Sequence, residues 1–228
     1  MVVRIGLLRK KAALTQEQFR RHWRETHGPI AARLPGLRRY RQNPVVDSAQ
    51  RGIDYRRSAL VIDGFSQLWF DDLASMHRSL QSDAVAALAA DEANLIDEIR
   101  LVSCEQNVVI PTPSDRPLIK RMSTLKRRLD VTPEQFRREW FEVHSFLVKR
   151  LPQVKGYSQN LVLERALQRG RPAAYEELPL DGIVELWFED VPSLQAAFAS
   201  DAGRTLMTHA TEFIDEITTF LVEPVDIL

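Results

Sequence analysis

The stretch "LTQEQFRRHWRETHGPIAARLPGLRRYRQN" at residues 14–43 decides the fold, because the chain contains it twice. It aligns without gaps with "VTPEQFRREWFEVHSFLVKRLPQVKGYSQN" at residues 131–160, so that His27 matches His144. Two later blocks also recur: "DGFSQLWFDDL" (63–73) matches "DGIVELWFEDV" (181–191), and "LIDEI" (95–99) matches "FIDEI" (213–217). The chain is therefore an internal duplication of a unit of roughly 110 residues.

The join between the two copies lies in "IPTPSDRP" at residues 110–117. Three prolines among polar residues are typical of a connection between folded units. The sequence therefore predicts two repeats, residues 1–112 and 113–228, with the boundary near Thr112.

Each copy alternates between strand and helix patterns. In the first copy, Thr15 with Gln18 forms a capping-box signal for a helix that Pro35 ends. A second helix is expected over residues 72–90, with a break near residues 82–83. Strands are expected at "VVRIGLLR" (2–9), "LRRYRQNPVV" (37–46), "SQLWF" (66–70) and "DEIRLVSCEQNVVI" (97–110).

The resulting order, βαββαβ, predicts an α+β fold made of two ferredoxin-like repeats, each with its helices on one face of an antiparallel sheet. The other face of each sheet must also be buried if its residues are apolar. We therefore expect the two sheets to pair into a barrel within one chain, which makes the protein its own pseudo-dimer.

Composition narrows the function classes. The chain has 31 Lys+Arg and 31 Asp+Glu residues, so its formal net charge is zero and the usual signature of a nucleic-acid-binding protein is missing. The single cysteine, Cys104, excludes an intrachain disulfide framework and is expected in a strand core. No segment is long and apolar enough to span a bilayer. These features favour a cytoplasmic protein that acts on a small molecule rather than on a membrane.

His27 lies among apolar positions of the first predicted helix, where a leucine would be expected. The stripe consists of Phe19, Trp23, His27, Ile30 and Leu34, and the second copy repeats it as Phe136, Trp140, His144, Leu147 and Leu151. A buried imidazole without a partner costs about 1–3 kcal/mol, so each histidine needs a hydrogen-bond partner or a polar cavity. Both interpretations remain open: a core histidine bonded to a carbonyl or tyrosine, or a proton carrier that lines a pocket.

The next strand adds further polar candidates. Tyr40 and Asn43 reappear as Tyr157 and Asn160. Strand alternation places Tyr40 and Asn43 on opposite faces unless Pro44 bends the strand, so not all of them can reach one pocket.

We predict no metal site. His22 and His27 lie about 140° apart around a helix, unlike the i, i+4 pair of a zinc-binding helix, and the second copy has Glu139 in place of His22. The remaining histidines, His77 and His209, are expected on the surface.

With these residues in view, the chain resembles the EthD family of dimeric α+β barrels, whose members have a helix ending in His-Gly-Pro followed by a strand with Tyr and Asn. "LWFDDLASMHRSLQSD" (68–83) is similar to the family's second helix entry. The resemblance implies a pocket between sheet and helices, with His27 as its acid or base and Tyr40 and Asn43 as orienting partners. In the second copy Ser145-Phe146 replaces Gly28-Pro29, so Phe146 is expected to close that pocket, although His144 remains a candidate.

Members of the family that the chain resembles include isomerases, decarboxylases and dehydratases. The resemblance therefore implies an enzyme without a cofactor that moves a proton on a small carbonyl, lactone or phenolic compound. His27 would be the base, Tyr40 a hydrogen-bond donor and Arg9 a counter-charge at the strand end. Further substrate-binding candidates are Trp23, Asn43, Trp69, Tyr157 and Asn160. The alternative is a non-catalytic binding or accessory protein. Haem-dependent oxidation, a third class, has no support from these histidines. The tandem chain could also form a homodimer.

Overall fold

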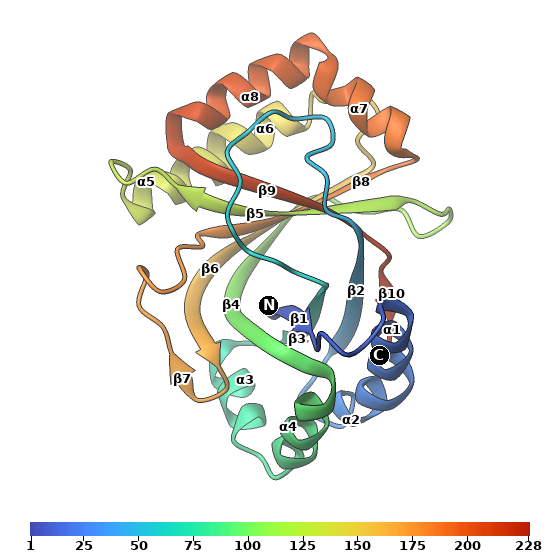
Figure 1. The fold of residues 1–228 in the computed structure, drawn as a ribbon. Helices are drawn as coiled ribbons and strands as arrows, with labels where there is room; N and C mark the ends of the chain where they lie inside the picture. The colour runs from blue at the N-terminus through green and yellow to red at the C-terminus, as the bar shows by residue number, and fades with distance from the viewer.

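An eight-stranded antiparallel barrel forms the centre of the computed structural model, which describes residues 1–228 (Figure 1). The first repeat supplies β1 (Val2–Lys10), β2 (Arg39–Asp47), β3 (Gly64–Phe70) and β4 (Ile96–Ile110). The second supplies β5 (Ile119–Arg127), β6 (Gly156–Gln168), β8 (Gly182–Phe188) and β9 (Ile214–Val222). Two short strands, β7 (Arg171–Pro172) and β10 (Val225–Asp226), extend β6 and β2.

The two repeats close the barrel at equivalent junctions. The strand order is β2-β3-β1-β4-β6-β8-β5-β9, and β9 pairs with β2 to complete the ring. At the other junction β4 runs antiparallel to β6. The predicted α+β class and the intrachain barrel are therefore confirmed. The predicted boundary near Thr112 falls in the connection between β4 and β5.

Helices cover the outside of the barrel, those of the first repeat on one side and those of the second on the opposite side (Figure 1). The first repeat has α1 (Gln16–His22), α2 (Gly28–Ala31), α3 (Leu73–Leu80) and α4 (Ala84–Leu95). The second has α5 (Pro133–Arg138), α6 (Ser145–Val148), α7 (Val191–Ala199) and α8 (Asp201–Phe213). The predicted capping box of Thr15 and Gln18 forms, and the predicted helix break separates α3 from α4. No helix combines the length and hydropathy that a bilayer crossing requires.

The first predicted helix of each repeat is not a continuous α-helix. A π-helical turn interrupts it, η1 (Trp23–His27) in the first repeat and η2 (Glu139–His144) in the second. In η1 the Gly28 N–H donates to the carbonyl of Trp23, five residues earlier. Pro29 does not cause the widening, because the second repeat has Phe146 at the matching position and widens as well. Each widened turn ends on the histidine of the repeated motif.

The barrel interior is a core separate from the cores under the helices. Its apolar side chains include Val3, Ile5, Phe65, Val102, Cys104, Met122, Ile183 and Phe220. Cys104 is fully buried there, as expected of a strand core residue. Outside the barrel, Trp23 packs on Gly64 and Trp140 on Gly182, each ring reaching within 2.5 Å of where a β-carbon would stand.

The connection after the second strand of each repeat reaches across to the other repeat (Figure 1). Residues 48–63 lie against the second repeat, where Ile53 joins the core under α7 and α8 and the Tyr55 hydroxyl donates to the carbonyl of Ile214. The β6–β7 hairpin lies against the first repeat, where Arg169 donates to Glu92 of α4. Each helix layer is thus completed by a segment of the other repeat.

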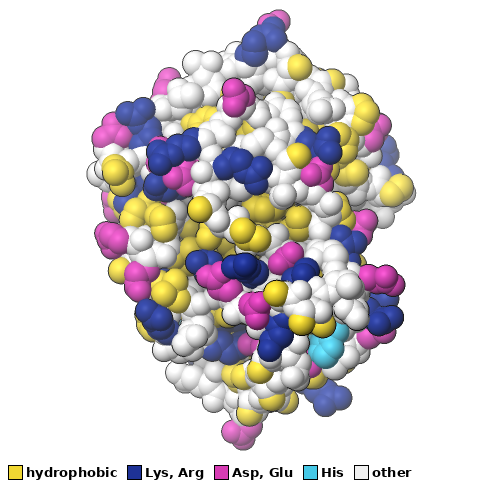
Figure 2. Space-filling model, viewed as in Figure 1, with side chains coloured by type: hydrophobic (Ala, Val, Ile, Leu, Met, Phe, Trp, Pro, Cys, Tyr) yellow, Lys and Arg dark blue, Asp and Glu magenta, His cyan; other side chains and the backbone are white.

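Charges of both signs are interspersed over the face shown in Figure 2, without a broad basic patch. This distribution agrees with the balanced composition.

Candidate functional site

Each repeat contains a cavity between its sheet and its helices, which is where the resemblance places a pocket. The first cavity includes His27 in its lining. The lining of the second includes His144. The two repeated histidines therefore lie in equivalent places.

His27 is held by a carboxylate in the first cavity. Its Nδ1–H donates to Oδ2 of Asp91 on α4, at 2.9 Å, and the His22 Nε2–H donates to the other carboxylate oxygen at 2.8 Å. The His27 side chain is 7% exposed, and its Nε2 makes no hydrogen bond within the protein. Because a carboxylate accepts at Nδ1, the neutral ring has its free lone pair on Nε2.

Burial lowers the pKa of His27 below its usual 6.5, although the hydrogen bond to Asp91 acts in the opposite direction. The ring is therefore neutral at pH 7, the state that a proton acceptor requires. No group of three or more His, Cys, Asp or Glu side chains is arranged to hold a metal ion.

Tyr40 supplies a hydroxyl to the same cavity. Its oxygen accepts hydrogen bonds from Trp23 Nε1 at 3.2 Å and from Gln42 Nε2 at 3.0 Å. The Gln42 side chain also donates to the carbonyl of Trp23. Because both hydroxyl lone pairs are occupied, the Tyr40 proton is free to be donated to a molecule in the cavity. Burial raises the pKa of Tyr40, which keeps the hydroxyl protonated.

Three charged residues of the first cavity are absent from the sequence-based candidates: Arg4, Glu92 and Arg169. Arg4, on β1, is 7% exposed, and burial followed by the neighbouring Arg169 lowers its pKa to about 9. One sequence signal could have identified it, since an arginine interrupts the apolar first strand and recurs as Arg121 in the second copy.

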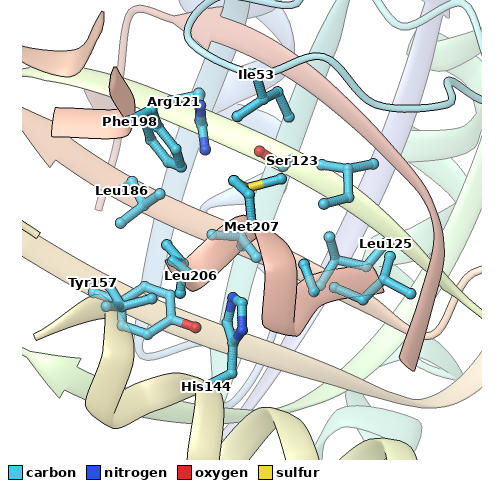
Figure 3. A pocket seen from close by; sticks show the side chains of 15 residues that line it. Ile53, Arg121, Ser123, Leu125, His144, Tyr157, Leu186, Phe198, Leu206 and Met207 are labelled. Atoms are coloured by element: carbon cyan, nitrogen blue, oxygen red, sulfur yellow. The ribbon is translucent and has the colours of Figure 1, made fainter. Parts of the chain in front are cut away.

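The second cavity is mainly apolar, since 12 of its 15 lining residues are hydrophobic. Figure 3 shows His144 and Tyr157 on one side of it, Arg121 and Phe198 on the other, and Met207 between them. The Tyr157 hydroxyl accepts from Gln159 at 2.8 Å, as its counterpart does from Gln42.

His144 has a different partner from His27. Its Nδ1 is hydrogen bonded to Nδ1 of His209 at 3.1 Å, and the two rings stack. Burial, with His209 adding to the effect, lowers the pKa of His144 to about 3. His209 occupies the position of Asp91, and Glu139, which replaces His22, lies 3.6 Å from the far nitrogen of His209. The second repeat thus lacks a carboxylate in contact with its cavity histidine.

Two expectations about the second repeat were wrong. His209 is not a surface residue, since its side chain is 12% exposed and contacts His144. Phe146 does not close the second cavity, because it is 64% exposed and lies beside Lys149. His77 is exposed, as expected, and binds Glu164.

Several sequence candidates do not meet at His27. Asn43, Asn160 and Trp69 lie on the interior side of the barrel strands, away from both cavities. Strand alternation accounts for this separation, and Pro44 does not bring Asn43 round to the helix side. Arg9 is 54% exposed and faces Glu98, so it does not line the cavity either. Of the candidates, Trp23 and Tyr40 join His27, whereas Tyr157 joins His144.

Comparisons with known proteins agree with this architecture. The EthD domain model matches residues 11–99 and again residues 128–217. No curated protein matches the sequence.

Solved structures of similar fold include an anthrone oxidase-like protein, with a TM-score of 0.66 at 9% identity over 99% of this chain and 93% of that one. A monooxygenase-like protein of Fusobacterium nucleatum gives a TM-score of 0.61 at 8% identity, covering 98% of this chain and 91% of the other. Identities this low establish the shared fold alone. Because the family model covers most of the sequence in two copies, the chain belongs to the EthD family, as a tandem member folded into an intrachain dimeric α+β barrel.

Proposed function

We propose that the first cavity catalyses proton transfer, without a cofactor, on a small carbonyl, lactone or phenolic metabolite, as an isomerase or lyase does. The observation that carries this proposal is the buried His27–Asp91 pair, which leaves the basic Nε2 unpaired beside a cavity. The proposal treats His27 as the catalytic base and Asp91 as its positioning residue.

In the proposed reaction Nε2 of His27 removes a proton from a carbon next to the carbonyl. The electron pair of the broken C–H bond moves to the carbonyl oxygen, which accepts a hydrogen bond from Tyr40. Asp91 stabilises the imidazolium that forms, and His27 then returns the proton to another atom of the same molecule. A positioned acid–base group of this kind typically contributes about 10²–10⁴-fold to the rate.

Exchange of C–H for C–D in D₂O tests this chemistry without knowledge of the natural substrate. A panel of small β-keto acids, unsaturated lactones and acyl phenols is incubated with the protein and followed by proton NMR. We expect His27→Gln to reduce protein-dependent exchange by about 10²-fold or more, and Asp91→Asn to reduce it less. Asp83→Asn, which changes an exposed aspartate at the start of α4, serves as the matched control.

His144→Gln in the same assay reports on the second repeat. Retention of full exchange in His27→Gln, with loss in His144→Gln, would move the activity to the second cavity and contradict the proposal. Full exchange in both single variants would exclude either histidine as the base.

A second candidate function applies to the second cavity, which we propose binds an apolar metabolite without catalysis. Its predominantly apolar lining and the low pKa of His144 favour this role. Titration with naphthalene, followed by tryptophan fluorescence, measures binding. Leu206→Phe, which fills the cavity, should weaken it, whereas Leu88→Phe in the first cavity should not. Equal loss in both variants would contradict an assignment to the second cavity.

A further inference from the structure

Arg4 is a buried cation without a partner. It is 7% exposed, yet its guanidinium makes no hydrogen bond and no ion pair within the protein. A buried charge without a partner is destabilising unless something in the site compensates it. Since Arg4 lines the cavity of His27, the compensating group belongs in that cavity.

Glu92 attracts Arg4 electrostatically, but it raises the pKa of Arg4 less than burial and Arg169 lower it. The cavity also contains Arg169 and Glu92, but Glu92 is already engaged by the Arg169 guanidinium, with Nε donating at 2.8 Å. Two guanidinium groups therefore face one carboxylate. Asp91 does not line the cavity, and both of its oxygens accept from histidines. One positive charge of the cavity remains without a counterion.

The matching arginine of the second repeat behaves differently. Arg121 stacks on the Phe198 ring, with 4.2 Å to the ring centroid, and donates to the carbonyl of Arg51 at 3.3 Å. Arg121 is also buried without a counterion, and burial lowers its pKa to about 9, but it has this one carbonyl acceptor and a ring face, whereas Arg4 has no acceptor within the protein. All of the Arg4 guanidinium N–H groups therefore remain available to a ligand of the first cavity.

Arg4 also lies where the cavity meets an outer groove. This groove shares Arg4 and Arg169 with the cavity. Arg165 and Arg171 of the β6–β7 region line it further, against a single carboxylate, Glu164. Arginines in a concave path attract anions and speed their entry.

We propose that the first cavity binds a small carboxylic acid, with its carboxylate on the Arg4 guanidinium and its apolar body among the side chains of the helix layer. An arginine fork matches a carboxylate with two parallel hydrogen bonds. The apolar part of the lining is Leu8, Trp23, Ala31, Leu68, Leu88, Ile96, Ile99 and Leu101. This assignment deepens the proposed function, on which it rests for the reaction at His27, by naming the class of substrate. It also gives the second repeat a role in the first site, since Arg169 comes from that repeat.

Calorimetric titration with benzoate and with benzamide tests the anion site directly, because the two probes have the same shape and differ in charge. We expect the wild-type protein to bind benzoate at least about 10-fold more tightly than benzamide. Arg4→Met should remove this preference, and Arg4→Lys should retain part of it, because lysine keeps the charge without the fork. Arg33→Met, which removes an exposed arginine, should bind benzoate as the wild type does.

Equal affinity of the wild type for both probes would overturn the proposal, as would an unchanged preference in Arg4→Met. If Arg4→Met does not fold, the Trp23 indole N–H resonance decides the location in the wild type. Benzoate should shift it, and a benzoate-selective site that leaves it unmoved would place the anion elsewhere.

His27→Gln separates this proposal from the proposed function. The variant should still prefer benzoate, because Arg4 holds the carboxylate. Loss of the preference in both His27→Gln and Arg4→Met would contradict Arg4 as a distinct anchor. Intact benzoate selectivity together with unchanged C–H exchange in His27→Gln would leave the anion site standing and refute the proton-transfer function.

Discussion

At the scale of single residues, the partner of each histidine decides what the histidine can do. Asp91 and His209 occupy equivalent positions, yet one is a carboxylate and the other an imidazole. His27 can accept a proton that Asp91 then stabilises, whereas burial and the neighbouring His209 disfavour protonation of His144. The two copies of one motif therefore have different chemistry.

The different environment of His144 gives the protein a pH-dependent stability. The pKa of His144 is about 3 in the folded protein and near 6.5 in the unfolded chain. Above pH 6.5 neither state is protonated there, so the full stability is present. Below pH 6.5 His144 takes up a proton in the unfolded chain but stays neutral in the folded protein. The free energy of unfolding therefore falls as the pH decreases towards 3.

We expect this residue alone to lower the free energy of unfolding by up to about 1.4 kcal/mol per pH unit between pH 6 and 4.5. Urea unfolding at several pH values measures it. The slope should be smaller in His144→Leu and unchanged in His77→Gln, which alters an exposed histidine. Equal slopes in the wild type and His144→Leu would show that His144 is not the group responsible.

The sequence identified His27 and Tyr40 as pocket residues but could not identify Asp91. The hydrogen bond to Asp91 joins residues 64 positions apart and depends on how α4 packs over η1. The predicted counter-charge was Arg9, at the end of the first strand, and not Arg4, in the middle of it. In the structure the mid-strand position faces the helices and the strand end faces solvent.

At the scale of elements, the approximate helix limits and the order of helices and strands along the chain followed from capping residues, prolines and periodicity. The π-helical turns did not, because a widened turn changes the hydrogen-bond register without a distinct composition. Both turns place a tryptophan ring on a glycine of the neighbouring strand. The approach of helix to sheet is set by these two contacts.

Gly64→Ala tests the contact between η1 and β3. A β-carbon there would lie 2.5 Å from the Trp23 ring, so the ring must move, and we expect a loss of about 1–3 kcal/mol in the free energy of unfolding. Displacement of Trp23 should also disturb its hydrogen bond to Tyr40 and reduce C–H exchange.

Gly182→Ala is the matched control, because it makes the same clash with Trp140 in the second repeat. It should destabilise the protein similarly and leave exchange at the first cavity unchanged. Wild-type stability in Gly64→Ala would mean that the packing of Trp23 on β3 is looser than described.

At the scale of the whole molecule, the duplication predicted the barrel but not the polar cluster inside it. Lys120 Nζ lies 2.6 Å from Glu185 Oε2, and both side chains are almost completely buried. Lys120 also donates to Asn43 and Gln67, which explains why these amides lie away from the cavities. The first repeat has Val3 and Gln67 at the positions of Lys120 and Glu185. The ion pair thus exists in one repeat only.

We expect Lys120→Val alone to lower the free energy of unfolding by about 3–5 kcal/mol, because it leaves Glu185 buried and unpaired. The double variant Lys120→Val/Glu185→Gln, which copies the first repeat, should lose less than Lys120→Val alone. Denaturant unfolding of the two variants measures both. A double variant less stable than the single one would contradict the account of this pair.

The sequence also did not reveal that a connecting segment of each repeat packs against the other repeat. Ile53 of the first repeat lines the second cavity, and Arg169 of the second lines the first. Aligning the two copies shows which residues are equivalent. It does not show whether a connecting loop packs on its own repeat or on the other one. Because the two units are fused in one chain, the cavity of each repeat is lined in part by a residue of the other repeat.

Nitrogen-15 NMR of the histidine rings across pH measures whether Asp91 holds His27 as a neutral base with a free Nε2. We expect His27 to be neutral at pH 7 with its proton on Nδ1, and to titrate below 6.5. Asp91→Asn should weaken that tautomer preference. A neutral His27 ring with its proton on Nε2, or a ring that is cationic at pH 7, would show that His27 is not the base.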